Sequence, residues 1–453
     1  MIRRRGQGIQ SPGLARLTKG SAQPRVLDMT SFHVWTIGCQ MNDADAARVH
    51  EGLSALGWHP VATSAEADLV VLLTCVVRQS AEDRVLGRLS SLKSLKRARP
   101  NAVLAVMGCF VGDAAVLKER FPYVEAFFRP SDVAGLLQYA CSLVSEHVPL
   151  GGDRAPSRRG QQVCVMVPIS YGCDHHCTYC IVRLRRGRQR SRPLPEIVQE
   201  VRALTERGAR EVTLLGQNVD AYGLDLGTDG PDLADALTAL SEIADLWRIR
   251  FLTSHPAHIS DKLIDAVAHM PSVCPHFELP VQSGDDRVLQ HMGRNYTVGR
   301  YSELVERIRR KVPGSSIATD VIVGFPGESL AEFQATVDLV SSTRFDAVHI
   351  AKYSPRSGTP AALLPDDVSP EEKERRRLVL EELQKGIARA SNQNLLGQSV
   401  QVLVEDRQRG RWRGRTANNK LVFLEDEHEW RGRIANVRIT WAGAWSLRGT
   451  AER

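Results

Sequence analysis

The stretch Cys173-Asp174-His175-His176-Cys177-Thr178-Tyr179-Cys180 carries three thiols in eight residues, and the interpretation of the rest of the chain starts from it. Thiols at the spacing Cys-x3-Cys-x2-Cys can all turn toward one metal centre from a single short loop. A structural zinc site needs a fourth ligand, which His175 or His176 could supply. A cluster of iron and sulfur held by only three thiolates instead keeps one iron open to a further ligand. The spacing predicts a metal centre and leaves both alternatives open.

The composition is that of an ordinary globular protein, with 43% hydrophobic and 25% charged residues among 453. No apolar run approaches the roughly 20 residues that a membrane span needs. The basic start, Met1–Arg5, lacks the apolar segment that follows it in a signal peptide. Nine cysteines, an odd number in a long chain, argue against a disulfide framework and favour reduced thiols that act as ligands. We therefore expect a cytoplasmic protein without a membrane span.

The net charge is +7, and arginines are concentrated in two short stretches. A run of like charge is usually a solvated surface. Dense arginine beside a metal centre also suits a polyanion such as RNA. The two groups are Arg183, Arg185, Arg186, Arg188, Arg190 and Arg192, directly after the cysteine loop, and Arg407, Arg409, Arg411, Arg413 and Arg415.

Residues 31–148 repeat a pattern of strand and helix three times, and each strand ends on a cysteine. Parallel strands joined by right-handed crossovers have their carboxyl ends at one edge of the sheet. Cys39, Cys75 and Cys109 should therefore meet where open α/β sheets bind ligands. Three buried structural thiols are the alternative, but three cysteines at three strand ends favour a second cluster held by three thiolates. The expected strands are His33–Gly38, Asp68–Thr74 and Ala102–Gly108, and the expected helices include Asp43–Leu56 and Gln79–Arg97.

Two stretches without periodicity separate the folded parts. Residues 1–30 are rich in Arg, Gly, Ser and Pro and are predicted to be a disordered leader, with Met29 as a second possible start of translation. Residues 149–161 have the composition of a linker.

Residues 162–391 alternate six strands with helices, which predicts an incomplete version of the (β/α)8 barrel. The expected strands are Val163–Ile169, Glu211–Leu215, Arg248–Thr253, His276–Val281, Ser316–Val323 and Ala347–Tyr353. The expected helices include Leu194–Arg207, Asp232–Ala244, Val298–Lys311 and Leu330–Ser342.

Polar loops that contain glycine or proline follow these strands. In any single loop, such residues are explained by the needs of a turn. When they occur on the same face of every unit they suggest the rim of a cofactor site, because glycine lets backbone N–H groups approach a ligand closely. His255 could act as a base or a ligand, although a hydrogen-bonded loop histidine is the favoured alternative. The loops are Ser170–Cys180, Gly216–Asn218, Ser254–Pro256, Gln282–Gly284, Gly324–Glu328 and Ser354–Thr359.

A charged helix at about Pro370–Arg389 leads into a β-rich segment, residues 392–453, which is predicted to form a small β-barrel. This segment contains eleven Lys and Arg but only seven Asp and Glu, and it holds four of the seven tryptophans of the chain. Basic and aromatic side chains on a small barrel can stack bases and bind phosphates. We expect Trp412 to be exposed among the arginines and Trp441 to be buried.

These features together resemble the methylthiotransferases, which are radical S-adenosylmethionine (radical SAM) enzymes. The resemblance covers nearly everything from about residue 31 onward. It implies an N-terminal open parallel α/β sheet domain, a central partial (β/α)6 radical SAM barrel and a C-terminal small β-barrel, the RNA-binding TRAM domain. The motifs that carry it are Gly38–Asn42, Thr74–Arg78, Gly108-Cys109, Gly172–Cys180, Arg186-Gly187, Ser191–Pro193, Asp320–Glu328 and Ser446–Gly449.

Three groups of methylthiotransferases differ in substrate: isopentenylated adenosine in tRNA, threonylcarbamoylated adenosine in tRNA, or an aspartate of a ribosomal protein. Gly216–Val219, Ser254–Pro256 and Leu279–Gly284 resemble the first group. That group methylthiolates C2 of N6-isopentenyladenosine next to the anticodon. Breaking an unactivated C–H bond is beyond side-chain acids and bases, so a cofactor must carry the reaction. The non-enzymatic alternative is a zinc-stabilised RNA-binding protein.

The resemblance also implies the cofactors, partners and site residues. Cys173, Cys177 and Cys180 would hold one [4Fe-4S] cluster, which binds S-adenosylmethionine. Cys39, Cys75 and Cys109 would hold a second, which supplies sulfur. Expected partners are tRNA and an electron donor of flavodoxin or ferredoxin type, and the protein is expected to be a monomer. Cofactor contacts are expected from Tyr179, Gly216, Gln217, Ser254, Gln282, Gly324 and Gly327, RNA contacts from Arg186, Arg411, Trp412 and Arg413, and core positions for Cys141, Cys164 and Cys274.

Overall fold

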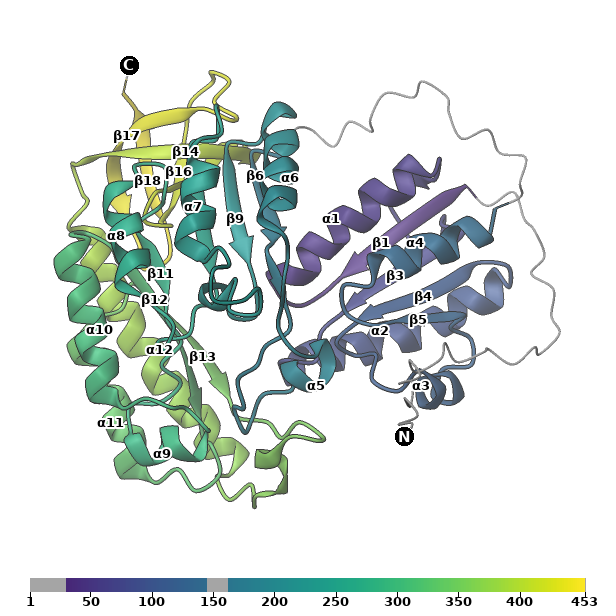
Figure 1. Ribbon diagram of the computed structural model, residues 1–453, viewed down its shortest axis with the longest axis horizontal. Helices are drawn as coiled ribbons and strands as arrows, with labels where there is room; N and C mark the ends of the chain where they lie inside the picture. The colour runs from purple at the N-terminus through teal and green to yellow at the C-terminus, as the bar shows by residue number, and fades with distance from the viewer. Residues whose placement is uncertain (1–29, 145–161, 453) are drawn as a thin grey trace, which may run out of the picture.

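The computed structural model describes residues 30–144 and 162–452, which form three folded parts (Figure 1). An N-terminal sheet domain lies beside a central barrel of strands and helices, and a small barrel of strands lies at one end of the central barrel. This is the α/β architecture that the sequence predicts. The expected linker, and all but Thr30 of the expected leader, lie outside the described residues. Within the described ranges, no helix is long and apolar enough to cross a membrane.

The N-terminal domain is a parallel sheet with helices on both faces. Its elements are β1 (Ser31–Thr36), α1 (Gln40–Ala55), β2 (His59–Pro60), β3 (Leu69–Thr74), α2 (Gln79–Ala98), β4 (Val103–Gly108), α3 (Ala114–Arg120), β5 (Ala126–Phe128) and α4 (Val133–Ser142). The strand order is β2-β1-β3-β4-β5. Helices α1 and α4 pack on one face and α2 and α3 on the other, so every residue of β3 and β4 is buried. The three predicted strands are confirmed.

The central part contains all six predicted strands. They are β6 (Cys164–Pro168), β9 (Glu211–Leu215), β10 (Arg248–Leu252), β11 (His276–Glu278), β12 (Ser316–Val323) and β13 (Ala347–Lys352). All neighbouring pairs are parallel, in the sheets β6-β9-β10 and β11-β12-β13. A bridge between Ile249 and Val273 joins the two sheets, and one continuous apolar core fills the resulting open barrel.

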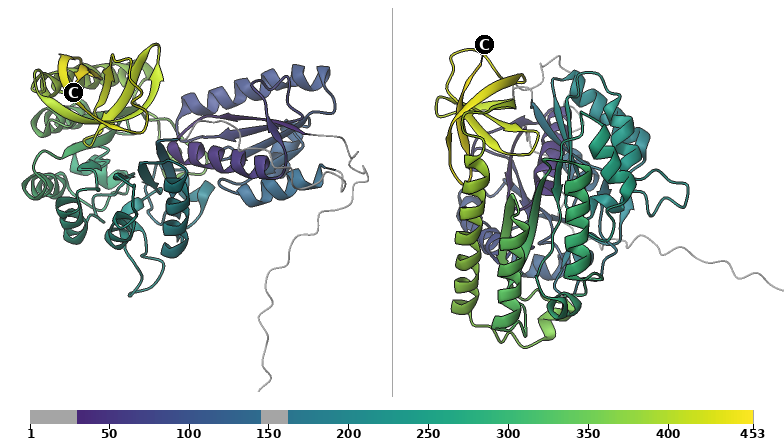
Figure 2. Two further views of the ribbon diagram at one scale, coloured as in Figure 1. Left: turned by 90° about the horizontal axis from the view of Figure 1, so that it is seen from above. Right: turned by 90° about the vertical axis from the view of Figure 1, so that its left-hand side faces the viewer.

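Helices cover the outside of this barrel, and short elements occupy its loops. The outer helices are α6 (Leu194–Glu206), α7 (Leu233–Ser241), α8 (Asp261–His269), α10 (Val298–Lys311), α11 (Leu330–Thr343) and α12 (Pro370–Gln393). The loop elements are β7 (Ser170–Tyr171), α5 (Val182–Arg186), β8 (Arg190–Ser191), η1 (Val219–Ala221), α9 (Asp286–His291) and η2 (Pro360–Leu363). Figure 2 shows α12 running along the central barrel as far as the C-terminal barrel.

The C-terminal part is a closed barrel of five strands, as predicted. The strands are β14 (Ser399–Gln408), β15 (Arg411–Thr416), β16 (Leu421–Leu424), β17 (Ile434–Ala442) and β18 (Leu447–Ala451), in the order β14-β15-β16-β18-β17. Its interior is filled by nine buried side chains, which come from all five strands. Most of them are valines and leucines.

The predicted exposure of the two tryptophans is wrong in both cases. Trp412 is only 4% exposed and belongs to the core of the small barrel, where its Nε1 donates to the backbone oxygen of Asp426 (3.1 Å). Alternation along β15 turns Trp412 inward and its arginine neighbours outward. Trp441 is 44% exposed, because an irregularity between Ile439 and Trp441 breaks the alternation of β17.

The small barrel docks on the amino ends of the central strands through buried charged groups. Arg250 of β10 pairs with Glu211 of β9 (2.8 Å) and donates to the backbone oxygens of Thr416 and Ala417 (both 2.7 Å). His276, at the start of β11, hydrogen-bonds Ser316, whose hydroxyl donates to the backbone of Asn418. A buried ion pair is costly to break, because the remaining charge stays buried alone.

The buried tryptophan generates a stability prediction. Trp412→Ala should destabilise the C-terminal barrel by about 3–5 kcal/mol, because it leaves a cavity in a small core. Trp441→Ala, in the same barrel, removes an exposed ring and should cost less than about 1 kcal/mol. Urea unfolding followed by hydrogen exchange in β14 to β18 measures both. Equal losses in the two variants would contradict the assignment of Trp412 to the core.

The docking histidine generates a pH prediction. Burial, and then the charge of Arg250, lower the pKa of His276 to about 3, so the folded protein holds the ring neutral. In the unfolded chain the ring binds a proton near pH 6.5. Below about pH 6.5, protonation of the ring in the unfolded chain favours unfolding, whereas above that pH the ring is neutral in both states and this effect is absent. The free energy of unfolding therefore falls as the pH drops below about 6.5, by at most about 1.4 kcal/mol per pH unit from this residue. Between pH 7.5 and 5.5, the free energy of unfolding should fall less steeply in His276→Gln than in the parent. Identical slopes would refute the prediction.

Candidate functional site

The cysteine loop between β7 and α5 is held from two sides at the carboxyl ends of the barrel strands. The backbone nitrogen of Thr178 donates to the oxygen of Met292, and the oxygen of Thr178 accepts from the nitrogen of Ala361 (both 2.9 Å). Tyr179 packs with the buried side chains of Phe325 and Tyr353 beneath the loop. These contacts give a fixed loop that carries three cysteines of intermediate exposure.

A buried arginine that the sequence did not reveal lies beside these thiols. Arg294 donates to Cys177 Sγ (3.5 Å), to the hydroxyl of Tyr296 (2.9 Å) and to the backbone oxygen of Pro280 (2.7 Å). It follows α9 without any charge pattern or motif around it, so nothing in the sequence singled it out. Burial raises the pKa of Cys180 to about 12, which keeps the free thiol protonated. A metal that binds thiolates would displace this proton, and the Arg294 cation favours the negative charge that results.

The second set of thiols meets at the carboxyl ends of β1, β3 and β4, as their spacing predicts. These strands are neighbours in the sheet, and the nitrogen of Cys109 donates to the oxygen of Thr74 (3.0 Å). A hydrogen bond with Cys75, the charge of Arg186 and backbone amides at the start of α1 outweigh burial and lower the pKa of Cys39 to about 5. The hydrogen bond with Cys39, and then burial, raise the pKa of Cys75, and burial raises that of Cys109. The three N-terminal thiols therefore interact with one another.

Glycines immediately before two of these cysteines let the backbones come this close. Gly38 has φ +132°, and a Cβ added to it would lie 2.4 Å from Cys75 Cβ. Gly108 has φ +124°, and a Cβ there would lie 2.3 Å from the backbone oxygen of Thr74. Both conformations are rare for any residue with a side chain. The glycines therefore form a cradle that a larger residue would close.

Three buried polar atoms at the carboxyl edge of the barrel suit a bound cofactor. Ser170 Oγ, Asn218 Oδ1 and Ser254 Oγ are buried, and none has a hydrogen-bond partner among the described residues. Unpaired buried polar groups are costly and rare unless a ligand or water satisfies them. Ser254 was expected at this rim from the sequence. Gln217 instead holds the cysteine loop, since its Oε1 accepts from the nitrogen of Gly172 (2.6 Å).

The other expected rim residues are engaged in shaping the edge. An added Cβ on Gly216 would lie 2.6 Å from Ser170 Oγ, so this glycine leaves room for that hydroxyl. Gln282 has φ +73° and exchanges backbone hydrogen bonds with Asp320 and Ile322 (both 2.9 Å). Its side chain is almost fully buried.

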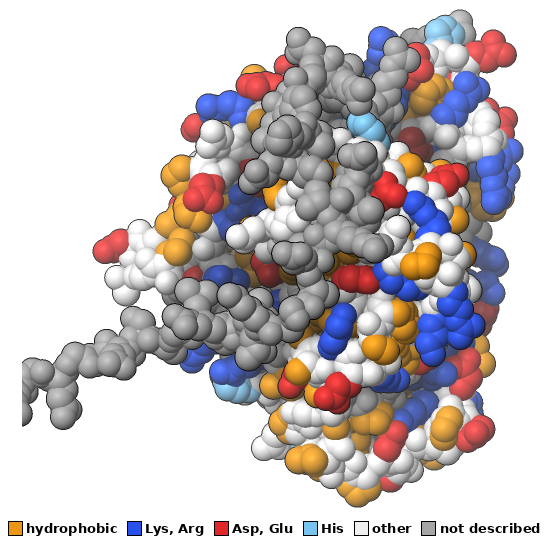
Figure 3. Space-filling model, turned by 90° about the vertical axis from the view of Figure 1, so that its right-hand side faces the viewer, with side chains coloured by type: hydrophobic (Ala, Val, Ile, Leu, Met, Phe, Trp, Pro, Cys, Tyr) orange, Lys and Arg blue, Asp and Glu red, His pale blue; other side chains and the backbone are white. Residues whose placement is uncertain are grey.

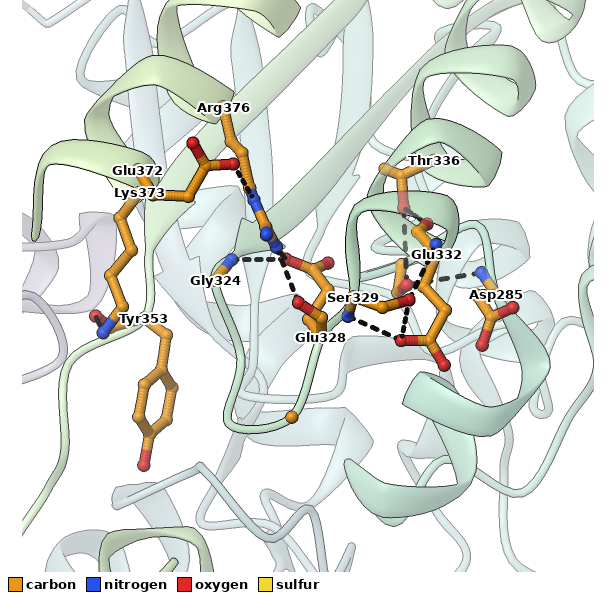
Figure 4. Close-up of polar contacts among 12 residues, drawn as sticks. Asp285, Gly324, Glu328, Ser329, Glu332, Thr336, Tyr353, Glu372, Lys373 and Arg376 are labelled. Carbon is orange, nitrogen blue, oxygen red and sulfur yellow. Dashed lines mark hydrogen bonds and ion pairs between the residues drawn. The ribbon is translucent and has the colours of Figure 1, made fainter. Parts of the chain in front are cut away.

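The loop Gly324–Glu328 is fastened from inside the protein (Figure 4). Glu328 accepts from the nitrogen of Gly324 (2.6 Å) and from Arg376 of α12 (2.7 Å). The nitrogen of Gly327 donates to Asp367 (2.8 Å). The backbone N–H groups of both expected glycines are therefore already bonded, and the loop acts here as a rigid wall of the site.

Histidines line the same edge but are engaged with each other. His175 stacks on His255 with ring centroids 3.7 Å apart, and the backbone nitrogen of His255 donates to both carboxylate oxygens of Asp220 (3.0 and 3.1 Å). Burial lowers the pKa of His255 to about 2, so its ring is neutral. Among the described residues, no group of three or more Cys, His, Asp or Glu is arranged to hold a single metal ion. Thiols of a cubane cluster each bind a different iron, and so stand further apart than ligands that share one ion.

The residues expected to contact RNA are largely engaged within the protein. Arg411 pairs with Glu425 (2.5 Å) and Arg413 with Asp406 (2.7 Å). Arg407, Arg409 and Arg411 line an open hollow of about 540 Å³ together with Glu425, Asp426 and Glu427, so its charge is mixed. Trp412 is buried, and Arg186 turns toward the N-terminal domain. On the face drawn in Figure 3, acidic and basic side chains are likewise interspersed.

The three remaining cysteines lie away from both sets of thiols. Cys274 is buried as expected, and Cys164, at the start of β6, is partly buried. Cys141 is exposed near the end of α4, so its predicted core position is wrong. It lies on the outer side of a helix whose buried positions are Val133, Leu136 and Ala140.

Comparisons with known proteins agree with this division of the chain. Three family models match: Uncharacterized protein family UPF0004 over residues 31–129, the Radical SAM superfamily over 167–340 and the TRAM domain over 393–451. The solved radical S-adenosylmethionine methyltransferase TsrM from Kitasatospora setae is similar in fold, with a TM-score of 0.53 and 14% identity. That likeness covers 74% of this chain and 75% of the other.

Two relatives are similar over nearly their whole length, and both are called tRNA-2-methylthio-N(6)-dimethylallyladenosine synthase. The protein from Herpetosiphon aurantiacus is 44% identical over 433 residues, which is 93% of this chain and 98% of the relative. The protein from Roseiflexus sp. is 46% identical over 454 residues, 98% of this chain and 94% of the relative. Identity at this level over the full domain set shows descent from one family. The chain belongs to the tRNA-2-methylthio-N(6)-dimethylallyladenosine synthase family of radical SAM enzymes.

Proposed function

We propose that this protein methylthiolates C2 of N6-dimethylallyladenosine next to the anticodon of tRNA. The observation that carries the proposal is the presence of two sets of three thiols, each at the carboxyl ends of parallel strands, one in the N-terminal sheet and one in the central barrel that packs against it. One set suits cleavage of S-adenosylmethionine and the other suits delivery of sulfur. The names of the relatives supply the substrate and favour it over threonylcarbamoylated adenosine and a ribosomal-protein aspartate.

The radical SAM family implies a [4Fe-4S] cluster and S-adenosylmethionine. We assign the first cluster to Cys173, Cys177 and Cys180 and a second [4Fe-4S] cluster to Cys39, Cys75 and Cys109. When bound, these groups supply the radical that breaks the C–H bond and the sulfur that replaces the hydrogen. Both sets of residues fit such groups: three thiols converge in each, and an arginine cation lies beside each.

The protein's own residues position the thiols, contact the cofactor and shield the site from water. The backbone bonds of Thr178 fix the first set of thiols, and the Gly38 and Gly108 cradle fixes the second. The unpaired oxygens of Ser170 and Ser254 are available to polar groups of the cofactor. Tyr179, with its buried apolar neighbours, closes the site to water from below. Exclusion of water protects a reactive intermediate from side reactions.

The C-terminal barrel is the proposed grip on tRNA, through a surface other than the one expected from the sequence. The guanidinium of Arg448 lies 4.6 Å from the ring of Trp441, and Trp441 and Trp445 are both exposed. Exposed aromatic rings with a neighbouring cation can stack bases. We further propose a monomer that acts in the cytoplasm and receives electrons from a donor of flavodoxin or ferredoxin type.

The first test counts iron and identifies the product. After anaerobic reconstitution, the parent should hold about eight iron atoms, and Cys39→Ala and Cys173→Ala about four each, as expected for two cubanes. With dithionite and S-adenosylmethionine, the parent should methylthiolate isopentenylated tRNA. A parent that binds only zinc would support the RNA-binding alternative and defeat the proposal. Modification of only threonylcarbamoylated tRNA or only the ribosomal protein would refute the substrate.

A second test addresses the glycine cradle. Gly108→Ala places a Cβ against the Thr74 oxygen and should displace Cys109, so that a chain lacking Cys173, Cys177 and Cys180 loses most of its iron. Gly57→Ala is the matched control: its φ is +85°, but no described atom lies within 4 Å of the added Cβ. It should lower stability by about 1–2 kcal/mol and keep the iron. Full iron retention in Gly108→Ala would show that the close approach is not needed.

A further inference from the structure

Arg186 belongs by sequence to the arginine-rich stretch after the first set of thiols, yet its side chain lies against the second set. Its Nη2 donates to Asn42 Oδ1 of α1 (3.3 Å), and its Nη1 donates to Ser131 Oγ before α4 (3.1 Å). Its charge also acts on the thiols of Cys109 and Cys39. This one side chain, six residues after Cys180, therefore lies against α1, the turn before α4 and the cysteine that follows β4.

The partners of Arg186 are themselves held in unusual states. Ser131 has φ +61°, a left-handed conformation that is rare for a residue with a side chain. Its hydroxyl also donates to Asp45 Oδ2 (2.8 Å), and Asp45 is buried in α1 with its other oxygen unpaired among the described residues. Strain and incomplete pairing are tolerated where the surrounding structure maintains them for function. The hydrogen bonds from Arg186 to Ser131 and from Ser131 to Asp45 thus connect the central part to the N-terminal domain.

Charge gives this connection a second consequence. Arg186 acts electrostatically on Cys39 and Cys109, two of the three thiols that would become negative on binding iron, and the Asp45 carboxylate beside it offsets part of the positive charge of Arg186. A fixed positive charge stabilises the more negative, reduced state of a nearby cluster. In contrast, Arg188, two residues later, has its side chain 81% exposed and lies 3.9 Å from Asp174. The two arginines come from one stretch but point to different environments.

We propose that Arg186 is a positioning residue of the N-terminal thiol site: it ties the loop of the first thiols to the second set and raises the reduction potential of the cluster bound there. This inference rests on the proposed function, since it presupposes a cluster on Cys39, Cys75 and Cys109. It replaces the role in RNA contact that its neighbours suggest.

The experiment uses a full-length chain in which Cys173, Cys177 and Cys180 are replaced by alanine, so that iron binds only at the N-terminal thiols. Iron content and the midpoint potential of the cluster, from a redox titration followed by electron paramagnetic resonance, are measured for this chain and for Arg186→Gln, Arg186→Lys and Arg188→Gln. Arg186→Gln should move the reduction equilibrium at least tenfold toward the oxidised state, a fall of about 59 mV for one electron. Arg186→Lys keeps the charge and should retain most of the potential, and Arg188→Gln should leave it unchanged.

The positioning role is read separately, by hydrogen exchange in the chain with all cysteines. Exchange in α5 should accelerate in Arg186→Gln and in Arg186→Lys, because neither side chain has the planar fork whose two nitrogens bond Ser131 and Asn42 separately. An unchanged potential in Arg186→Gln, or an equal shift in Arg188→Gln, would overturn the proposal. A parent of this background that binds no iron would instead refute the second cluster, and with it the proposed function.

Discussion

The site depends on an apolar seam between the N-terminal sheet and the central barrel. Met41 and Ala44 of α1 pack against Leu215 at the end of β9, with Tyr171 and Leu252 beside them. Ile181, directly after the cysteine loop, is buried in the core of the N-terminal domain. Because these contacts lie at the carboxyl ends of strands in both sheets, they bring together two edges that each carry thiols. The proposed reaction, which uses both sets of thiols, depends on this approach of the two edges.

Arginines lie at the points where negative charge would collect, and two of them, Arg186 and Arg356, also bridge the seam. Arg294 lies beside Cys177, Arg186 lies beside Cys109, and Arg356, close to Cys75, pairs with Glu82 of α2 (2.8 Å). Each of these three guanidiniums also bonds to a different element of the fold, so each cation is fixed in place. A fixed cation needs no reorganisation when the thiols ionise, which is the electrostatic advantage of a preorganised site.

Sequence periodicity was sufficient for the features that depend on backbone topology. Apolar runs located the central strands, and the rule that parallel carboxyl ends share an edge placed Cys39, Cys75 and Cys109 together. Trp412 could also have been placed correctly, because alternation in Arg411–Arg415 turns the arginines outward and the tryptophan inward. Trp441 could not, since the irregularity that exposes it leaves no mark in the sequence.

The side-chain partners of individual arginines likewise could not be predicted from the sequence. Arg186 is one of six arginines between residues 183 and 192, and the sequence predicts that it belongs to a solvated or RNA-binding surface. Its direction is set by the seam, which turns α5 so that its last residue meets Asn42 and Ser131. Arg294 has no charged neighbours to mark it, and its role follows from the path of the chain after α9. Tertiary packing, which no local pattern encodes, decides both cases.

In the proposed function, the chemistry takes place at one end of the central barrel and recognition of the substrate at the other. The thiols and the unpaired hydroxyls of Ser170 and Ser254 lie at the carboxyl ends of the strands, whereas the C-terminal barrel docks through Arg250 and His276 at the amino ends. A strand of five residues spans about 16 Å, so a free nucleoside cannot reach from one end to the other. A substrate held at both ends must be a macromolecule that extends along the protein. The position of the small barrel therefore favours a folded RNA over a free nucleoside as the substrate.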